Sequence, residues 1–182
     1  KQVIATNELA AKFYQACLTK TPYGKAALDY LHNRGITDDI IEDFSMGFAI
    51  NSFNGLMNAL GKRGYNGEML MQAGLAVPGK NGGAYDKFRG RVMIPIKDPR
   101  GRIVGFTGRI LGDGMPKYMN TGETEFFIKR YLLFGLDIAV NEIRKTRQAI
   151  VVEGHMDAIS LHAAGVKNAV ASMGTAFAAE QA

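Results

Sequence analysis

Two carboxylates four residues apart, Glu153 and Asp157, lie in the stretch of the chain best suited to chemistry. The branched apolar residues 150–152 precede them and predict a buried strand. Gly154 then allows a turn, and an apolar pattern predicts a helix over about residues 155–164. A carboxylate at the carboxyl end of a parallel strand lies at the sheet edge where α/β folds bind ligands. Asp157, in the first helical turn, complements the positive end of the helix dipole.

Carboxylate oxygens at such a junction are ligands that suit Mg²⁺, or Mn²⁺ in its place. Glu153 and Asp157 are therefore the candidate catalytic and metal-binding residues. The alternative is that Glu153 is a carboxylate at the sheet rim and Asp157 an ordinary helix-terminal charge. Spacing alone does not decide between the two.

The positive charge of the chain is concentrated in one middle segment. Residues 80–130 hold 11 of the 22 Lys and Arg residues but only 5 of the 17 Asp and Glu residues, and the net charge of the whole chain is +5. This asymmetry is typical of proteins that bind a phosphate backbone. A solvated basic face without a ligand remains the alternative.

Composition excludes several other classes. Hydrophobic residues make up 47% and charged residues 21% of the sequence, which is typical of a globular domain with a core. No apolar run reaches the roughly 18 residues that a membrane span needs, and no signal peptide is recognisable. Cys17 is the only cysteine, so an internal disulfide and a cysteine-rich zinc site are excluded, and a reducing, cytoplasmic location is expected.

The apolar periodicity predicts a helical front part followed by strands. Around residues 92–106 a hairpin is expected, with a turn at 98–101. Gly105 and Gly108 indicate either a close approach of another segment or a bend. Helices are predicted at 7–18, 25–33, 38–44, 53–62, 67–73 and 137–147, and further strands at 46–50 and 75–78.

Five motifs, in the same order, resemble those of DnaG-type bacterial primases. Residues 153–157, Glu-Gly-His-Met-Asp, resemble the Glu-Gly-Tyr-Met-Asp signature that opens the primase Toprim domain, with His155 in place of the usual Tyr. The other four are Phe-Arg-Gly-Arg-Val-Met-Ile-Pro-Ile at 88–96, Gly-Phe-Thr-Gly-Arg at 105–109, Pro-Lys-Tyr-Met-Asn at 116–120, and Ala-Val-Ala-Ser-Met-Gly-Thr-Ala at 169–176. The resemblance covers the chain from about Leu28 to its last residue.

The resemblance implies an α+β fold in two parts. Residues 1–147 would form an N-terminal subdomain, a helical layer with a mixed β-sheet. Residues 148–182 would form the first β-α-β part of an α/β Toprim domain, with a turn at Gly174 and Thr175.

The family's function implies RNA primer synthesis on single-stranded DNA by Mg²⁺-dependent nucleotidyl transfer from ribonucleoside triphosphates. Glu153 and Asp157 would hold the metal ion, and a set of basic and polar residues would bind template or nucleotide. These residues are Arg34, Arg89, Arg91, Arg109, Lys117, Tyr118, Asn120 and Lys129. Without the family, Arg34 is only a helix-terminal cation and residues 111–124 are an ordinary surface loop.

The sequence lacks features that the family carries elsewhere. Zinc would bind only in an N-terminal domain that is missing here, and the replicative helicase would bind through a missing C-terminal domain. An Asp-x-Asp pair with further metal ligands is also absent, so the chain alone is expected to bind single-stranded DNA weakly and to make no primers. Two alternatives stay open: another Toprim protein, such as a phage primase-helicase, and a nucleic-acid-binding module without chemistry.

Overall fold

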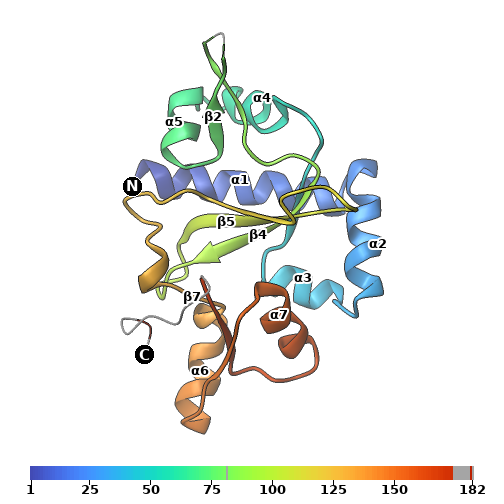
Figure 1. Ribbon diagram of the computed structural model, residues 1–182, viewed down its shortest axis with the longest axis vertical. Helices are drawn as coiled ribbons and strands as arrows, with labels where there is room; N and C mark the ends of the chain where they lie inside the picture. Colours follow the sequence, from blue (N-terminus) through green and yellow to red (C-terminus); the bar gives the residue numbers. More distant parts are fainter. Residues whose placement is uncertain (81, 174–180, 182) are drawn as a thin grey trace.

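The structure is a computed structural model that describes residues 1–80, 82–173 and 181 of the chain. Helices and sheets occur together, and they form three layers along the long axis of the molecule (Figure 1). An upper lobe of helices and a short hairpin lies above a central sheet, and a smaller α/β unit lies below it. This arrangement confirms the predicted α+β class.

The central sheet has the strand order β1-β4-β5-β6, and each pairing is antiparallel. The predicted hairpin is present, with Gly101 at φ 77° in its turn. The expected mixed sheet is not found here, because the β4–β5 hairpin and the pairings of β1 and β6 with its two edges are all antiparallel. The strands are β1 (Gly47–Ala49), β4 (Arg91–Lys97), β5 (Ile103–Ile110) and β6 (Tyr118–Asn120).

Helix α1 (Gln2–Thr19) crosses the central sheet and covers one of its faces (Figure 1). It begins five residues before the predicted start at Asn7, because Ile4 and Thr6 are buried. The buried Tyr14 ring meets Phe106 of β5 edge-to-face, with centroids 5.6 Å apart. The helix thereby fixes the strand that carries Arg109.

The upper lobe and the side of the molecule contain the remaining N-terminal helices. In the lobe, the buried Asp86 accepts hydrogen bonds from the amides of Leu56 and Met57 at 2.7 and 3.1 Å, which satisfies the first turn of a helix. The elements are η1 (Pro22–Gly24), α2 (Lys25–Asn33), α3 (Asp38–Asp43), α4 (Gly55–Gly61), α5 (Gly67–Gln72), β2 (Ala76–Pro78) and β3 (Ala84–Asp86).

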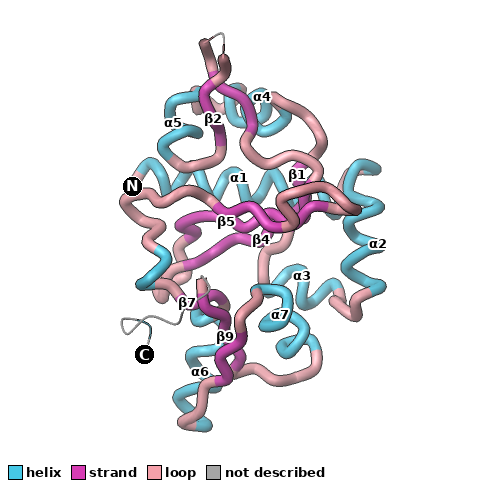
Figure 2. Tube along the Cα trace, viewed as in Figure 1, coloured by secondary structure: helices cyan, strands magenta, loops and turns pink. Residues whose placement is uncertain are grey.

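The lower unit contains the predicted β-α-β arrangement. Strands β8 (Ile150–Val152) and β9 (Ala169–Ser172) pair in parallel, and α7 (His155–Ala163) connects them. Strand β7 (Leu133–Phe134) pairs antiparallel with the other edge of β9, and α6 (Leu136–Thr146) follows it. Figure 2 shows these strands crossing between the two helices.

The sequence-based prediction of a buried strand at β8 was wrong. Ile150 and Val151 are 41% and 46% exposed, since β8 is an edge strand of the order β7-β9-β8. Three strands, β3, β6 and β7, were not predicted, and residues 107–110 extend β5 where a bend was one alternative. The predicted turn at Gly174 and Thr175 lies outside the described residues.

A shared core joins the central sheet to the lower unit. One cluster of buried side chains includes Ile94 of β4, Phe134 of β7, Met156 of α7 and Ala171 of β9. Strand β7 precedes the predicted boundary near Arg147, although it pairs with the lower sheet. The boundary therefore stays a prediction. Within the described ranges, no helix is both long and apolar enough to cross a membrane.

Candidate active site

A cleft of about 500 Å³ lies where the central sheet meets the lower unit. One side, which we call the cationic wall, consists of Arg34, Arg109, Lys117, Tyr118 and Asn120. The other side, the acidic wall, consists of residues 153–157, with Ser172 and Met173 beside it. The cleft therefore joins seven of the predicted site residues from segments more than 100 positions apart in the chain.

The acidic wall is built by the junction between β8 and α7. Glu153 follows the strand, and Gly154 is the N-cap residue of the helix with extended backbone angles, φ −109° and ψ 143°. The amide of Asp157 donates to the carbonyl of Gly154 at 3.1 Å, and the Asp157 side chain folds back over the glycine. A β-carbon on Gly154 would lie 2.7 Å from Asp157 Oδ2, so the absence of a side chain there makes room for the carboxylate.

Both carboxylates are exposed and face the same cleft. Mg²⁺ is commonly held by one or two carboxylates together with substrate phosphates and water. The donor set therefore fits Mg²⁺ in the presence of a phosphate ligand but does not form a closed protein cage. In agreement, the part of the chain that the structure describes contains no group of three or more His, Cys, Asp or Glu residues placed to hold a metal ion.

The cationic wall is held together by an aromatic ring. The guanidinium carbons of Arg109 and Arg34 lie 4.6 and 5.6 Å from the ring centroid of Tyr30 in α2. Cation–π contacts of this kind stabilise the arrangement by about 0.5–1 kcal/mol each at exposed sites. Arg109 also pairs across the strands with Tyr118, whose ring centroid is 6.0 Å from its guanidinium carbon. The guanidinium groups of Arg34 and Arg109 are thus held near one another on a surface that an anion can reach.

Sequence reasoning did not assign five of the residues that line the cleft. His155 packs edge-to-face on Phe134, with centroids 4.9 Å apart, and its Nε2 atom is buried without a hydrogen-bond partner among the described residues. Burial lowers the pKa of His155 to about 4, so the imidazole is neutral near pH 7. One signal in the sequence could have placed Ser172 and Met173 in the cleft. The predicted β-α-β arrangement makes β8 and β9 parallel, and parallel strands end at the same edge of a sheet. The five residues are Gly154, His155, Met156, Ser172 and Met173.

Three predicted residues lie outside the cleft. Arg89 donates to the carbonyl of Asp86 and stacks on Phe53 and Tyr85 of the upper lobe, at 4.5 and 5.3 Å. Arg91 is buried and bonds to backbone carbonyls. Lys129 lies in the short helix η2 (Lys129–Tyr131).

Comparison with known proteins gives this geometry a family. Residues 13–140 match the family described as DNA primase catalytic core, N-terminal domain, and residues 147–182 match the Toprim domain. The chain belongs to the DNA primase catalytic core family. The resemblance read from the motifs is therefore confirmed.

Relatives and solved structures agree with this assignment. A DNA primase of Staphylococcus aureus is 45% identical over 180 residues, which is 98% of this chain and 30% of the relative. A DnaG primase catalytic domain solved with bound ssDNA is 39% identical with a TM-score of 0.89, over 99% of this chain and 58% of that chain. The zinc-binding and RNA polymerase domains of Aquifex aeolicus primase are 34% identical with a TM-score of 0.89, over 99% of this chain and 44% of that chain. This chain thus spans about a third of the length of the curated relative.

Proposed function

We propose that this chain supplies the nucleotide- and template-binding half of a primase active site that makes RNA primers on single-stranded DNA. The observation that carries the proposal is the cleft, in which three cations face two carboxylates across one opening. A growing 3′-hydroxyl would attack the α-phosphate of a ribonucleoside triphosphate, and pyrophosphate would leave. Such a reaction needs positive charge around the phosphates and a metal-binding carboxylate nearby.

The cationic wall would bind the triphosphate. Arg34, Arg109 and Lys117 line the same cleft, so together they offset charge on neighbouring phosphate oxygens. Tyr118 and Asn120 add a stacking face and amide hydrogen bonds for a base. Because strand pairing aligns Arg109 with Tyr118, these groups keep a fixed spacing.

Glu153 and Asp157 would hold Mg²⁺, or Mn²⁺, through their carboxylate oxygens. When bound, the ion supplies charge stabilisation for the attacking and leaving oxygens. The open position of both side chains at the cleft leaves space for substrate phosphates to complete the coordination.

A second set of groups would guide the template over the upper lobe. Phe53 is 62% exposed, and the Arg89 guanidinium lies over its ring with Tyr85 alongside. Exposed aromatic rings with a nearby cation are typical of surfaces on which single-stranded bases stack. Burial, and then the charge of Lys129, lowers the pKa of Lys87.

The wider biological setting is proposed from the family. The relative solved with ssDNA supports a single-stranded template, and the Aquifex aeolicus relative includes a zinc-binding domain. We propose a cytoplasmic place at the bacterial replication fork, beside a replicative helicase. The match over residues 13–140 favours a primase over a topoisomerase, since it precedes the Toprim segment.

Titration of the chain with a labelled single-stranded oligonucleotide at several salt concentrations tests the proposed binding. Affinity should fall as salt rises, with a log–log slope of roughly −0.7 for each phosphate contact. Alanine at Arg109, Lys117 and Lys129 together should weaken binding and flatten that slope.

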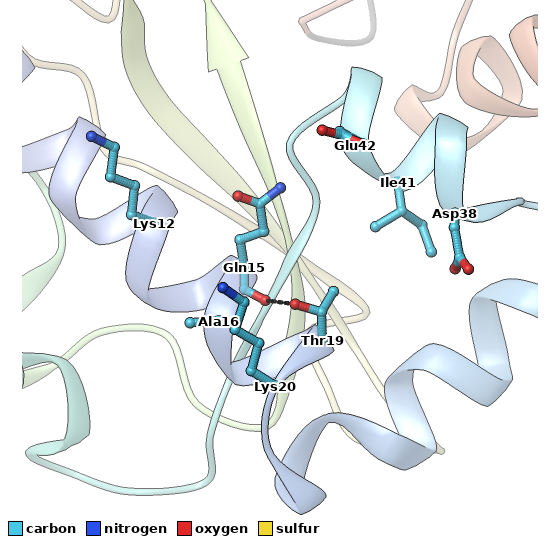
Figure 3. Close-up of a pocket in the computed structure, with 8 residues that line it drawn as sticks. All are labelled: Lys12, Gln15, Ala16, Thr19, Lys20, Asp38, Ile41 and Glu42. Atoms are coloured by element: carbon cyan, nitrogen blue, oxygen red, sulfur yellow. Dashed lines mark hydrogen bonds between the residues drawn. The ribbon is translucent and has the colours of Figure 1, made fainter.

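A matched control removes the same charge elsewhere. Lys12 and Lys20 line a separate groove between α1 and α3, shown in Figure 3, and Lys62 is exposed beyond α4. Alanine at these three positions should leave the salt slope close to that of the unmodified chain. Equal losses in the two triple variants would show that only net charge matters, and Arg109, Lys117 and Lys129 would lose their assignment as binding residues.

A further inference from the structure

Arg91, at the start of β4, is a cation that the protein keeps away from solvent. Its side chain is only 4% exposed. Its Nη1 atom donates to the carbonyl of Gly108 at 3.1 Å and to that of Pro116 at 2.9 Å, with a longer contact of 3.5 Å to the carbonyl of Lys117. Nη1 carries two hydrogens, so the two shorter bonds use both of them. The guanidinium is thus engaged by the protein's own backbone.

These carbonyls belong to the two strands that build the cationic wall. Gly108 immediately precedes Arg109 in β5, and Pro116 and Lys117 lead directly into β6. The amide of Ile110 donates to the carbonyl of Lys117 at 3.0 Å, which closes the same junction from the other side. Arg91 therefore binds the backbone on both sides of the exposed loop between β5 and β6.

The space for Arg91 depends on Gly108. A β-carbon on Gly108 would lie 3.0 Å from Cδ of Arg91 and 3.0 Å from Cδ1 of Phe88. Side chains of the neighbouring strand segment therefore occupy the space beside this glycine. Burying a cation is costly unless polar groups compensate for lost water. Here carbonyl dipoles do so, and that compensation requires the loop to keep its position.

We propose that Arg91 is a positioning residue of the cleft, which holds the β5–β6 junction so that Arg109 and Lys117 face the same anion without touching that anion itself. The functional part of this inference rests on the proposed function. Arginine suits this role because one planar nitrogen presents two divergent N–H groups. Lysine instead carries a compact ammonium charge on a shorter side chain.

Hydrogen exchange of the free chain tests the structural part without any ligand. In Arg91→Met, amides of residues 117–120 should exchange about tenfold faster, the equivalent of losing one net hydrogen bond. Amides of β1 should be unchanged. The matched control is Arg102→Met, which removes an arginine at the far end of the same hairpin, where it pairs with Asp98 at 2.7 Å. The control should leave the amides of residues 117–120 protected, and unaltered exchange there in Arg91→Met would overturn the proposal.

A double-mutant cycle tests whether Arg91 acts through the cationic wall. Arg91→Met should weaken binding of a labelled single-stranded oligonucleotide several-fold in the unmodified chain. In a chain that already carries Arg109→Ala and Lys117→Ala, the same change should weaken binding by less than about twofold. Fully additive losses would mean that Arg91 contacts phosphate directly, which contradicts a positioning role.

Two further variants keep the result decisive. Arg91→Lys preserves the charge, so complete recovery of exchange protection and affinity would show that charge alone is needed and would overturn the proposal. If Arg91→Met fails to fold in a thermal melt, Gly108→Ala displaces the arginine stem from the opposite side and should give the same faster exchange. An unmodified chain that binds no oligonucleotide would refute the proposed function, while the exchange data would still decide the role of Arg91.

Discussion

The two sheets that border the cleft differ in how completely they are buried. In β4 and β5 all but the last one or two residues are buried, and each strand has a neighbour on both sides. In β8 two of the three residues are exposed, and β9 is its only neighbour among the described strands. Arg109 of the cationic wall is therefore carried by a strand with neighbours on both sides, while the acidic wall follows an edge strand with one open side.

Under the proposed function, this difference separates binding from chemistry. Cations that bind an extended polyanion must keep a constant spacing, and a fully packed sheet provides it. The carboxylates need only one correct arrangement around a small ion, which the ion itself helps to select. The two walls are nevertheless joined, since Lys97 of β4 lies 3.5 Å from the carboxylate of Asp137 in α6, with both side chains mostly buried.

The largest effect is expected at Glu153. In a primase in which this chain replaces the matching segment of the Staphylococcus aureus relative, Glu153→Gln should reduce primer synthesis by orders of magnitude, because an amide cannot replace a metal-binding or proton-accepting carboxylate. Affinity for single-stranded template should change little, because the cationic wall is intact. The unmodified chimaera is the reference for both measurements, and near-normal synthesis by the variant would remove Glu153 from the active site.

The next effect concerns stability and compares the sheets directly. Phe106→Ala in β5 empties a fully buried site beside Tyr14 and should cost about 3–5 kcal/mol of unfolding free energy. Val151→Ala in β8 changes a half-exposed side chain and should cost no more than about 1 kcal/mol. Urea denaturation of both variants checks this. Similar losses would show that β8 is packed as firmly as β5.

A smaller effect is expected at Tyr30, which supports the two arginines of the cationic wall. Tyr30→Leu should weaken binding of a single-stranded oligonucleotide by about fivefold, because the loss of a cation–π contact frees the guanidinium groups. Tyr30→Phe keeps the ring face and should bind almost normally. If the phenylalanine variant is as weak as the leucine variant, the hydroxyl group matters and the ring does not.

The smallest effect is a pH dependence from the hairpin turn. Burial alone would raise the pKa of Asp98, but hydrogen bonds from Arg102 and from the amides of Arg100 and Arg102 outweigh it and lower the pKa. Because the folded pKa is below the unfolded value, the stabilisation is complete above the unfolded pKa of 3.8 and is lost as pH falls through the folded pKa. Asp98→Asn should therefore flatten the loss of stability below about pH 4 in urea titrations. If the loss of stability below about pH 4 is the same in Asp98→Asn as in the unmodified chain, Asp98 does not make this contribution.

The sequence predicted the site better than it predicted the surroundings of individual side chains. Glu153 and Asp157 could be placed because strand, glycine and helix follow one another within eight residues. Lys117 and Asn120 could be named from the motif, but β6 could not be predicted, since a three-residue strand among glycines has no periodicity to read. Its existence depends on pairing with β5, which is a tertiary contact.

Burial was the other property that local sequence did not provide. Arg89 and Arg91 are two residues apart and chemically identical, yet one stacks on exposed rings and the other is enclosed by carbonyls. Only the glycine on the neighbouring strand makes the second environment possible. The exposure of β8 could not be predicted for a similar reason. Three branched apolar residues give the same local pattern in a central strand and in an edge strand.

Gly154 has a consequence for how mutations at this site would behave. Its backbone angles are open to any amino acid, so replacement by alanine carries no conformational strain, and the methyl group would meet only the end of the Asp157 side chain. A carboxylate can rotate away at little cost to folding. An alanine allele should therefore express and fold normally yet need more divalent cation. In a genetic screen, added magnesium would suppress the phenotype of this mutation. Second-site suppressors would be expected to raise the supply of the ion rather than the stability of the protein.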